Sequence, residues 1–288
     1  MKVAVICLAY LGNSSGVGLL SKYFSRMDAH LFVHVDAKVP AEPYMSNESN
    51  VTLLPTRHEI FWGGFNTVEA AVSSIEFAKK MAHFQRFVFI TEDSIPIVSP
   101  GELKRQFALD VDWIAIHSPN PRWVWQRYQR FFYFDSRATS FRYFEAGTRF
   151  IREKDLRCLD RMQLLKRKGK AKLRQLYHGC GWWALSRDTV ETILERHYTD
   201  KWLRESFEFS AIPEEQYFHT IIGLSSLTRP RKFFMYVDWD RNSDVKPYVF
   251  SRCEELRGVQ EDNPELLFVR KIDLESTEVG VFVEELLR

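Results

Sequence analysis

The segment Phe87-Val88-Phe89-Ile90-Thr91-Glu92-Asp93 carries the pattern on which the predicted fold rests. A short run of aromatic and β-branched residues is typical of a buried strand, and here an acidic pair follows the run directly. In an open parallel sheet, ligands bind beyond the carboxyl ends of the strands. Glu92 and Asp93 are therefore predicted to lie at a binding edge.

Similar apolar runs occur on both sides of this segment, and helical patterns separate them. Strands are predicted at Val3–Leu8, His30–Val35 and Trp113–His117, and helices at Val17–Arg26 and Asn66–Met81. This alternation favours an α/β fold with a mostly parallel central sheet flanked by helices. Asp36 follows the second strand, so it is predicted to share the binding edge. We find no repeat or low-complexity linker and predict one domain over residues 1–288.

The composition is that of a globular protein with many aromatic residues. Of the 288 residues, 45% are hydrophobic and 27% are charged, which does not favour disorder. The aromatic content of 15% suits stacking on sugar rings or bases, but aromatic side chains also fill cores. A net charge of +2 is too small to indicate a nucleic-acid-binding protein. We therefore expect no nucleic-acid partner.

Cysteine spacing and the N-terminal run bear on the compartment. The four cysteines lie far apart without a CxxC pair, which argues against a structural zinc site and a disulfide framework. The apolar run after Met1 is too short to span a bilayer and is interpreted as the first buried strand. These features predict a cytoplasmic protein, with the inner face of the membrane as an alternative place of action.

The most informative segment for chemistry runs from Gly179 to Thr220. Two adjacent tryptophans, Trp182 and Trp183, follow glycines, where the backbone can bend sharply. Further along, Glu214 and Glu215 follow Pro213 and are predicted to open a helix. A carboxylate facing an aromatic wall suggests a base beside a platform for a sugar ring. The same residues are also typical of a helix-dipole interaction and of core packing.

The middle of the chain combines aromatic and basic residues. Arg122, Arg127 and Tyr128 lie in a segment without a clear period, which suggests a partly irregular region lining a cleft. Basic residues then cluster from Lys166 to Arg174. Such a run is most often a solvated face, and its alternative role is a peripheral contact with an anionic membrane or with a phosphorylated acceptor.

Several short segments, taken in order, resemble glycosyltransferase family 14, the core 2/I-branching β-1,6-N-acetylglucosaminyltransferases and peptide O-xylosyltransferases with their bacterial relatives. Each segment alone is weak, but their order is specific and they span nearly the whole chain. The matching segments are His34-Val35-Asp36-Ala37-Lys38, Trp62-Gly63-Gly64-Phe65, Thr91-Glu92-Asp93-Ser94-Ile95-Pro96, Gly181-Trp182-Trp183-Ala184-Leu185-Ser186-Arg187, Pro213-Glu214-Glu215, Tyr236-Val237-Asp238-Trp239 and Leu267-Phe268-Val269-Arg270-Lys271.

The resemblance implies a GT-A-like nucleotide-sugar transferase fold and an inverting transfer from a UDP-sugar, with N-acetylglucosamine or xylose as the sugar, to a glycan hydroxyl. It implies a nucleotide-binding half at residues 1–117 and an acceptor-binding and catalytic half at residues 118–288. The acceptor would be a glycan or a lipid-linked saccharide. The lack of an anchor segment suggests a bacterial-type member that builds a surface polysaccharide.

The resemblance also implies roles for individual residues. Glu215 would be the base that deprotonates the acceptor hydroxyl, and Lys271 would contact the diphosphate. Many relatives carry an arginine where this chain has Met235, so Arg231 and Lys232 are predicted to substitute for it. The remaining implied roles are a nucleoside contact for Asp36 and sugar contacts for Asp93, Trp182, Trp183 and Glu214. The alternative for both Asp36 and Asp93 is a turn-forming role, which is common at strand ends. Arg122, Arg127 and Tyr128, in a region that matches the family poorly, are predicted to help hold the acceptor.

Members of this family work without the divalent metal that most GT-A enzymes need, so we expect neither a metal nor another cofactor. Two segments have the DxD pattern of metal-dependent relatives, Asp110-Val111-Asp112 and Asp238-Trp239-Asp240. Asp112 precedes an apolar run, which puts it at the wrong end of a strand. The alternative to an enzyme is a glycan- or nucleotide-binding module that has lost catalysis. The joint presence of Glu215 and Lys271 argues against that alternative.

Overall fold

The computed structural model describes residues 1–129, 132, 134–135, 173–241 and 246–288. Its centre is a seven-stranded sheet in the order β3-β2-β1-β4-β7-β6-β8. The neighbouring strands β3, β2, β1 and β4 are parallel, whereas β7 runs antiparallel to both β4 and β6. The predicted mostly parallel sheet is thus confirmed. The strand bounds are β1 Val3–Ala9, β2 Ala29–Val35, β3 Val51–Leu53, β4 Arg86–Thr91, β6 Asp112–Trp113, β7 Trp183–Ser186 and β8 Arg231–Lys232.

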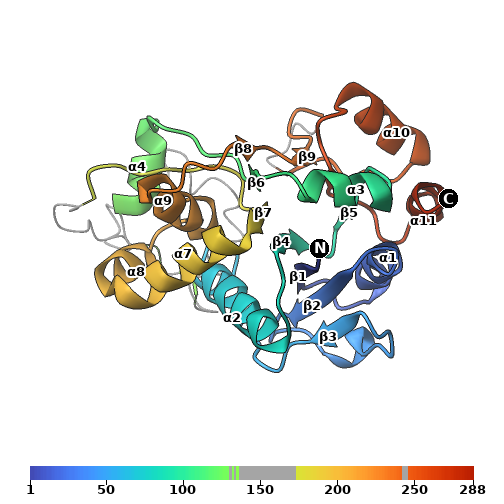
Figure 1. Ribbon diagram of the computed structural model, residues 1–288, viewed down its shortest axis with the longest axis horizontal. Helices are drawn as coiled ribbons and strands as arrows, with labels where there is room; N and C mark the ends of the chain where they lie inside the picture. The colour runs from blue at the N-terminus through green and yellow to red at the C-terminus, as the bar shows by residue number, and fades with distance from the viewer. Residues whose placement is uncertain (130–131, 133, 136–172, 242–245) are drawn as a thin grey trace.

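Helices cover both faces of this sheet (Figure 1). Alternate residues of β1 face opposite sides, so Val5 and Cys7 enter one hydrophobic core while Ala4 and Ile6 enter the other. The first core is closed by α1 Ser15–Phe24, α3 Pro100–Phe107, α10 Cys253–Asp262 and α11 Thr277–Leu286. The second core is closed by α2 Asn66–Met81, α4 Arg122–Gln129, α7 Arg187–Thr199, α8 Lys201–Phe207 and α9 Tyr217–Leu224.

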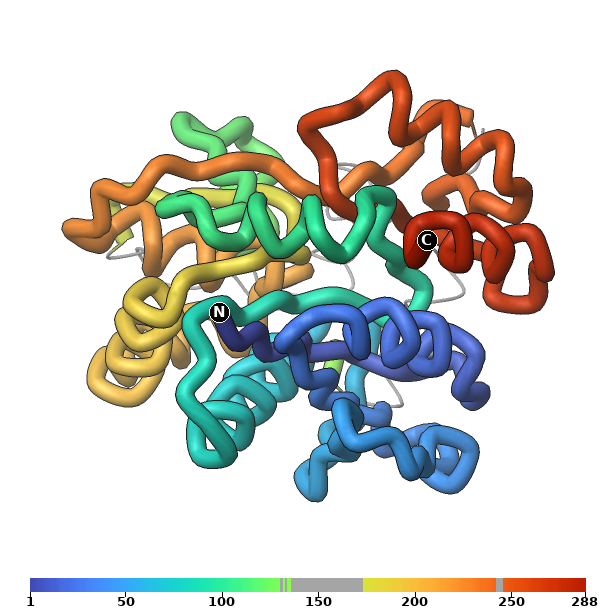
Figure 2. The backbone as a smooth tube through the Cα atoms, turned by 45° about the vertical axis from the view of Figure 1, so that its right-hand side comes forward, coloured from blue at the N-terminus to red at the C-terminus, as the bar shows by residue number. Residues whose placement is uncertain are grey.

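A second sheet of three strands brings the C-terminal part of the chain to the binding edge. Its order is β5-β10-β9, with β5 Ser94–Pro96, β9 Met235–Val237 and β10 Phe268–Arg270. Strand β10 pairs with β5 immediately after Asp93, so Arg270 lies opposite Ser94. Figure 2 shows the C-terminal segment, in red, beside the N-terminal α1, in blue. Because β10 pairs with β5, residues about 170 positions apart in the chain meet beside Asp93.

Two local predictions were wrong. The strand expected at Trp113–His117 covers Asp112–Trp113 only, because the chain then passes against the backbone of Gly179, and His117 forms an isolated bridge with His178. The helix expected from Glu214 begins at Tyr217 instead. Residues Pro213–Glu215 form a short 3-10 turn, which is described below with the site.

Within the described residues, no helix is both long and apolar enough to cross a membrane. Most of the basic run Lys166–Arg174 lies outside the described residues, and only Arg174 falls within them.

Candidate functional site

The loop after β1 is fixed by a buried carboxylate from the end of β4. One oxygen of Glu92, Oε1, accepts hydrogen bonds from the backbone N–H groups of Tyr10 and Leu11 at 2.5 and 2.6 Å. The Tyr44 hydroxyl donates to the same oxygen at 3.2 Å and accepts a bond from the Gly12 N–H. Burial raises the pKa of Glu92, and these donors oppose the rise. Glu92 therefore holds the shape of the loop that follows the first strand.

Asp93, its neighbour, is the centre of a buried ionic cluster. Arg270 donates to both Asp93 carboxylate oxygens, at 3.2 and 3.1 Å, and the Tyr10 hydroxyl donates to Oδ2 at 2.9 Å. The Lys271 Nζ lies 3.3 Å from the same oxygen. Burial acts to raise the pKa of Asp93, but Arg270 and Lys271 outweigh it and the pKa is lowered. Asp93 is thus an anion enclosed by its partners.

Asp93 faces two cations, of which Arg270 is buried while the Lys271 side chain keeps 33% of its surface exposed. The accessible positive charge of the cluster is therefore that of Lys271, at the carboxyl edge of the parallel strands. A cation exposed at this edge can neutralise a bound anion.

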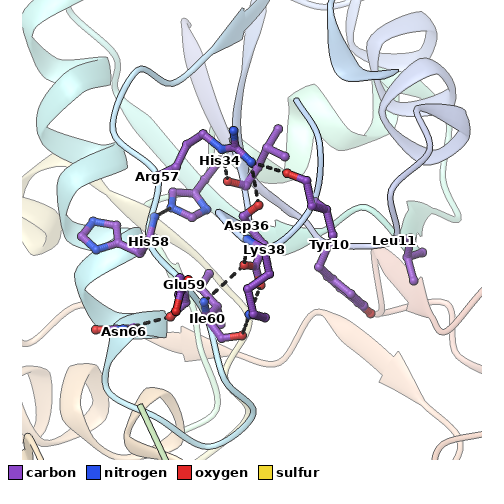
Figure 3. A network of polar contacts seen from close by, with 12 residues as sticks. Tyr10, Leu11, His34, Asp36, Lys38, Arg57, His58, Glu59, Ile60 and Asn66 are labelled. Carbon is purple, nitrogen blue, oxygen red and sulfur yellow. Dashed lines mark hydrogen bonds and ion pairs between the residues drawn. The ribbon is translucent and has the colours of Figure 1, made fainter. Parts of the chain in front are cut away.

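Asp36 lies two strands from β4 along the same edge, at the end of β2, and its backbone N–H donates to the Ala9 carbonyl at 2.8 Å. Its carboxylate accepts bonds from the Lys38 N–H and the Lys38 Nζ at 2.9 and 2.6 Å. Arg57 donates to the carbonyls of Val35 and Asp36, and Figure 3 shows Arg57 and Lys38 pointing toward Asp36. Asp36 therefore makes the contacts of a turn-forming aspartate.

The second acidic group lies on the turn before α9. Glu215 accepts a 3.0 Å hydrogen bond from Arg127 Nη1, which comes from α4, and its own side chain is 34% exposed. Burial raises the pKa of Glu215, while the Arg127 charge opposes this rise. The Arg127 guanidinium also stacks over the ring of Trp123 at 4.4 Å. The structure thus brings together Glu215 and Arg127, which the sequence assigned to the same half of the protein.

Backbone hydrogen bonds and a strained residue fix the turn that carries Glu214 and Glu215. Ile212 adopts a left-handed conformation with φ of +51°, which is strained for a β-branched residue. Its N–H donates to the carbonyl of Gly63, which has φ of +78° and belongs to the Trp-Gly-Gly-Phe segment. The Glu215 carbonyl accepts a bond from the Gly179 N–H at 3.0 Å. Two distant glycine segments therefore hold the turn that carries Glu214 and Glu215 from both ends.

Glu214 has a different environment from Glu215. Burial, followed by the neighbouring Glu215 charge, raises its pKa to about 8, so it is protonated at neutral pH. Its side chain passes close to Gly181, where a Cβ would lie 3.2 Å from the Glu214 Cγ. Adjacent carboxyl groups with separated pKa values are typical of acid–base sites.

The two tryptophans divide between the core and the site. Trp183 is 0% exposed and stacks on Phe89, so it cannot offer a face to a sugar, and the prediction of a stacking role for it was wrong. Trp183 is the first residue of β7 and is enclosed in the core, whereas Trp182 precedes the strand and packs on Phe89 at the margin of that core. Trp182 is half-buried, and Arg270 lies 4.7 Å from the centre of its ring. It belongs to the Asp93 cluster.

The segment Gly179–Trp182 joins the two clusters. Gly179 binds the Glu215 backbone, and three residues later Trp182 packs against Arg270. Between them, the half-buried Cys180 thiol has a pKa raised to about 11 by burial and by Glu215, with the Trp182 N–H and Arg270 opposing. Both charged groups therefore lie near the same short segment.

The remaining predicted site residues are placed elsewhere or in a different role. Tyr128 is buried against Phe207, so the prediction that it helps to hold an acceptor was wrong. Arg122 is exposed at the first position of α4. Arg231 and Lys232 lie on β8, three strands from β4 in the sheet, and contact the Leu227 carbonyl and the Trp113 ring respectively.

Three residues of the site were not singled out from the sequence. Arg270 lies in one of the family-like segments but no role was predicted for it, although its position directly before Lys271 could have indicated one. Tyr10 follows the first strand, as Asp36 and Glu92 follow theirs, so its place at the edge could have been inferred. Trp123 lies one helical turn from Arg127 and is 40% exposed.

Neither DxD segment fits a metal site. Asp112 accepts bonds from the Ser186 N–H and the Thr189 hydroxyl, and Asp110 pairs with Arg229. Asp238 is bound by the N–H groups of residues 240 and 241 and by the Arg241 guanidinium. Across the described ranges, no three His, Cys, Asp or Glu side chains gather in a group able to hold a metal ion. These carboxylates have structural partners in place of a metal.

Comparison with known families identifies the relationship. The model of the family described as Core-2/I-Branching enzyme matches residues 4–256, which is most of the chain. The chain belongs to this family. Its activity is accordingly that of a glycosyltransferase, which has a sugar donor and a glycan acceptor as substrates. The matched range holds Asp36, Asp93 and Glu215, while Arg270 and Lys271 follow it. No curated protein matches the chain.

Proposed function

We propose that this member of the Core-2/I-Branching enzyme family transfers a sugar, N-acetylglucosamine or xylose, from a UDP-sugar to a glycan hydroxyl, with inversion and without a divalent metal. The observation that carries this proposal is the joint arrangement of Glu215 on Arg127 and of Lys271 on Asp93, linked by Gly179–Trp182. A base and an exposed cation are the two groups that such a transfer needs.

Glu215 is the proposed base. A base must be ionised before it accepts a proton, and Arg127 stabilises the ionised form of Glu215. Glu214 has a pKa of about 8 and is protonated at neutral pH, so it can donate a hydrogen bond to a bound sugar but is not the base. Burial also raises the pKa of Glu215 above its ordinary value, which strengthens it as a proton acceptor.

The bond changes follow from these positions. The acceptor oxygen loses its proton to Glu215 and forms a bond to the anomeric carbon of the donor. The bond from that carbon to the diphosphate oxygen breaks, and its electron pair leaves with UDP. Lys271, the exposed cation of the Asp93 cluster, stabilises the diphosphate charge that develops. Asp36, at the end of β2, is the proposed nucleoside contact in addition to its turn-forming bonds with Lys38.

Aromatic surfaces near these groups are the proposed sugar platforms. Trp182 takes the place that the sequence assigned to Trp183, and it adjoins the Asp93 cluster. Trp123 stacks on Arg127 and keeps 40% of its surface exposed, so it is proposed as the platform on the acceptor side.

The test combines binding with turnover. Thermal stability would be measured with UDP, GDP and CMP, each in EDTA and again with Mn²⁺. A ligand at one hundred times its Kd adds about 2.7 kcal/mol to the free energy of unfolding, which gives a visible shift in Tm. A shift with UDP that EDTA leaves unchanged supports the proposal, and a shift that needs Mn²⁺ removes metal independence. UDP release from UDP-N-acetylglucosamine and UDP-xylose would then identify the donor, and the anomeric configuration of the product would test inversion.

A further inference from the structure

We propose that the Tyr10 hydroxyl is a positioning group that holds the Lys271 ammonium in place for the donor diphosphate. This inference rests on the proposed function and adds a residue to it that neither the sequence motifs nor the family assignment provides. Its basis is the geometry of three side chains at the carboxyl ends of β1, β4 and β10.

The hydroxyl of Tyr10 connects the anion and the exposed cation of the cluster. It donates to Asp93 Oδ2 at 2.9 Å and accepts from Lys271 Nζ at 3.2 Å. The Lys271 Nζ also lies 5.7 Å from the centre of the Tyr10 ring. One side chain thus contacts the ammonium with both its polar end and its ring.

Tyr10 is itself held rigidly. Its N–H is bound by the buried carboxylate of Glu92, which also binds the next N–H in the loop. Burial, with the Asp93 charge as the next cause, raises the pKa of Tyr10, so its hydroxyl stays protonated and can keep donating to Asp93. The lone pairs that remain on the oxygen face Lys271.

A flexible lysine benefits from such a partner. Asp93 already receives two hydrogen bonds from Arg270, so its pairing with Lys271 is shared. A lysine that is free to rotate loses side-chain entropy when it binds an anion, whereas one that is already held in position loses less. The hydroxyl of Tyr10 therefore contributes to diphosphate affinity through Lys271, without any contact with the nucleoside.

The substitution Tyr10→Phe removes this hydroxyl and keeps the ring. The experiment measures the Kd of UDP and of uridine by calorimetry in EDTA, in the full chain and in Tyr10→Phe, Lys271→Met and the double variant. The loss of one hydrogen bond predicts a UDP Kd about fivefold to tenfold higher in Tyr10→Phe. The Kd of uridine, which lacks phosphate, is expected to stay the same. In the Lys271→Met background, Tyr10→Phe should change the UDP Kd less than twofold.

Tyr44→Phe is the matched control, because it removes another tyrosine hydroxyl that binds Glu92 and the same loop but whose hydrogen bonds go to Glu92 and the Gly12 N–H and not to Lys271. Any effect of Tyr44→Phe should be equal in both backgrounds. If Tyr10→Phe leaves the UDP Kd unchanged, or raises the Kd of UDP and uridine equally, the inference is wrong. A parent chain that binds no UDP would overturn the proposed function and this inference together, whereas UDP binding without a Tyr10 effect overturns this inference alone.

Discussion

Replacing Arg127 by methionine tests whether Glu215 is the base. The guanidinium is buried and donates to Glu215 Oε2 at 3.0 Å, so its removal leaves the carboxylate without its cation. A cation at this distance lowers the pKa of a carboxyl group by about 1–3 units. Burial acts in the opposite direction and remains in the variant. The pKa of Glu215 should therefore rise further above its ordinary value.

The sign of the effect on activity follows from the role of a base. Glu215 must be ionised to accept a proton, so kcat/KM falls as the pH drops below its pKa. In Arg127→Met, the acidic limb of the pH profile should move to higher pH. At a pH two units below the new pKa, about one enzyme molecule in a hundred carries the ionised base. Part of the lost rate should return as the pH rises.

The assay is UDP release from UDP-N-acetylglucosamine, with water as the acceptor, between pH 5 and pH 9. Arg127→Lys keeps a positive charge and serves as the matched variant, with its acidic limb close to that of the parent chain. Removing Arg127 also removes packing and one partner of a partly exposed ion pair, so Tm is measured beside the rate. An acidic limb that stays at the same pH in a folded Arg127→Met would show that Glu215 is not the titrating base.

Three further outcomes are expected. Glu214→Gln should raise Tm relative to the parent chain, by an amount that grows between pH 5 and pH 8. The pKa of Glu214 is about 8 in the folded protein and lower in the unfolded chain, so Glu214 destabilises the folded parent increasingly as the pH rises through this window. Thermal unfolding scans of both proteins across this pH range check the prediction. Trp183→Ala should cost about 3–5 kcal/mol in denaturant unfolding as a core residue, whereas Trp123→Ala should leave stability within about 0.5 kcal/mol and lower kcat/KM for a saccharide acceptor. Gly16→Ala should destabilise the chain by several kcal/mol in the same assay, since a Cβ there would collide with the Glu92 carbonyl.

Much of the fold could be predicted from local pattern, because buried parallel strands are continuous apolar runs. Val3–Leu8, His30–Val35 and Asn66–Met81 agree with the observed elements to within one or two residues. The carboxyl ends of these strands were predicted as a binding edge, and the charged clusters lie there. The strand predicted at Trp113–His117 was too long, because the point at which the chain leaves the sheet depends on contact with the distant Gly179.

The site was less predictable, because its contacts join parts of the chain that no local pattern relates. Arg270 meets Asp93 only because β10 pairs with β5, about 170 residues away. The adjacent tryptophans posed a different problem. Trp183 begins β7 and is fully buried, whereas Trp182 lies just before the strand and stays half-buried, and the sequence does not show where the strand begins.

Family segments that carry no acid, base or cation still have a geometric reason to be present. Gly63 adopts a positive φ and accepts the bond from Ile212, whose own strained conformation orients the turn that bears Glu214 and Glu215. Gly179 allows the chain to pass the Ala115 carbonyl while its N–H holds the Glu215 backbone. A side chain at Gly179 would collide with the Ala115 carbonyl, and one at Gly63 would be strained by the positive φ, so either would disturb the turn that carries Glu214 and Glu215 without contacting these carboxylates. Gly63, which belongs to a family-like segment, therefore acts on the candidate site through the backbone of this turn.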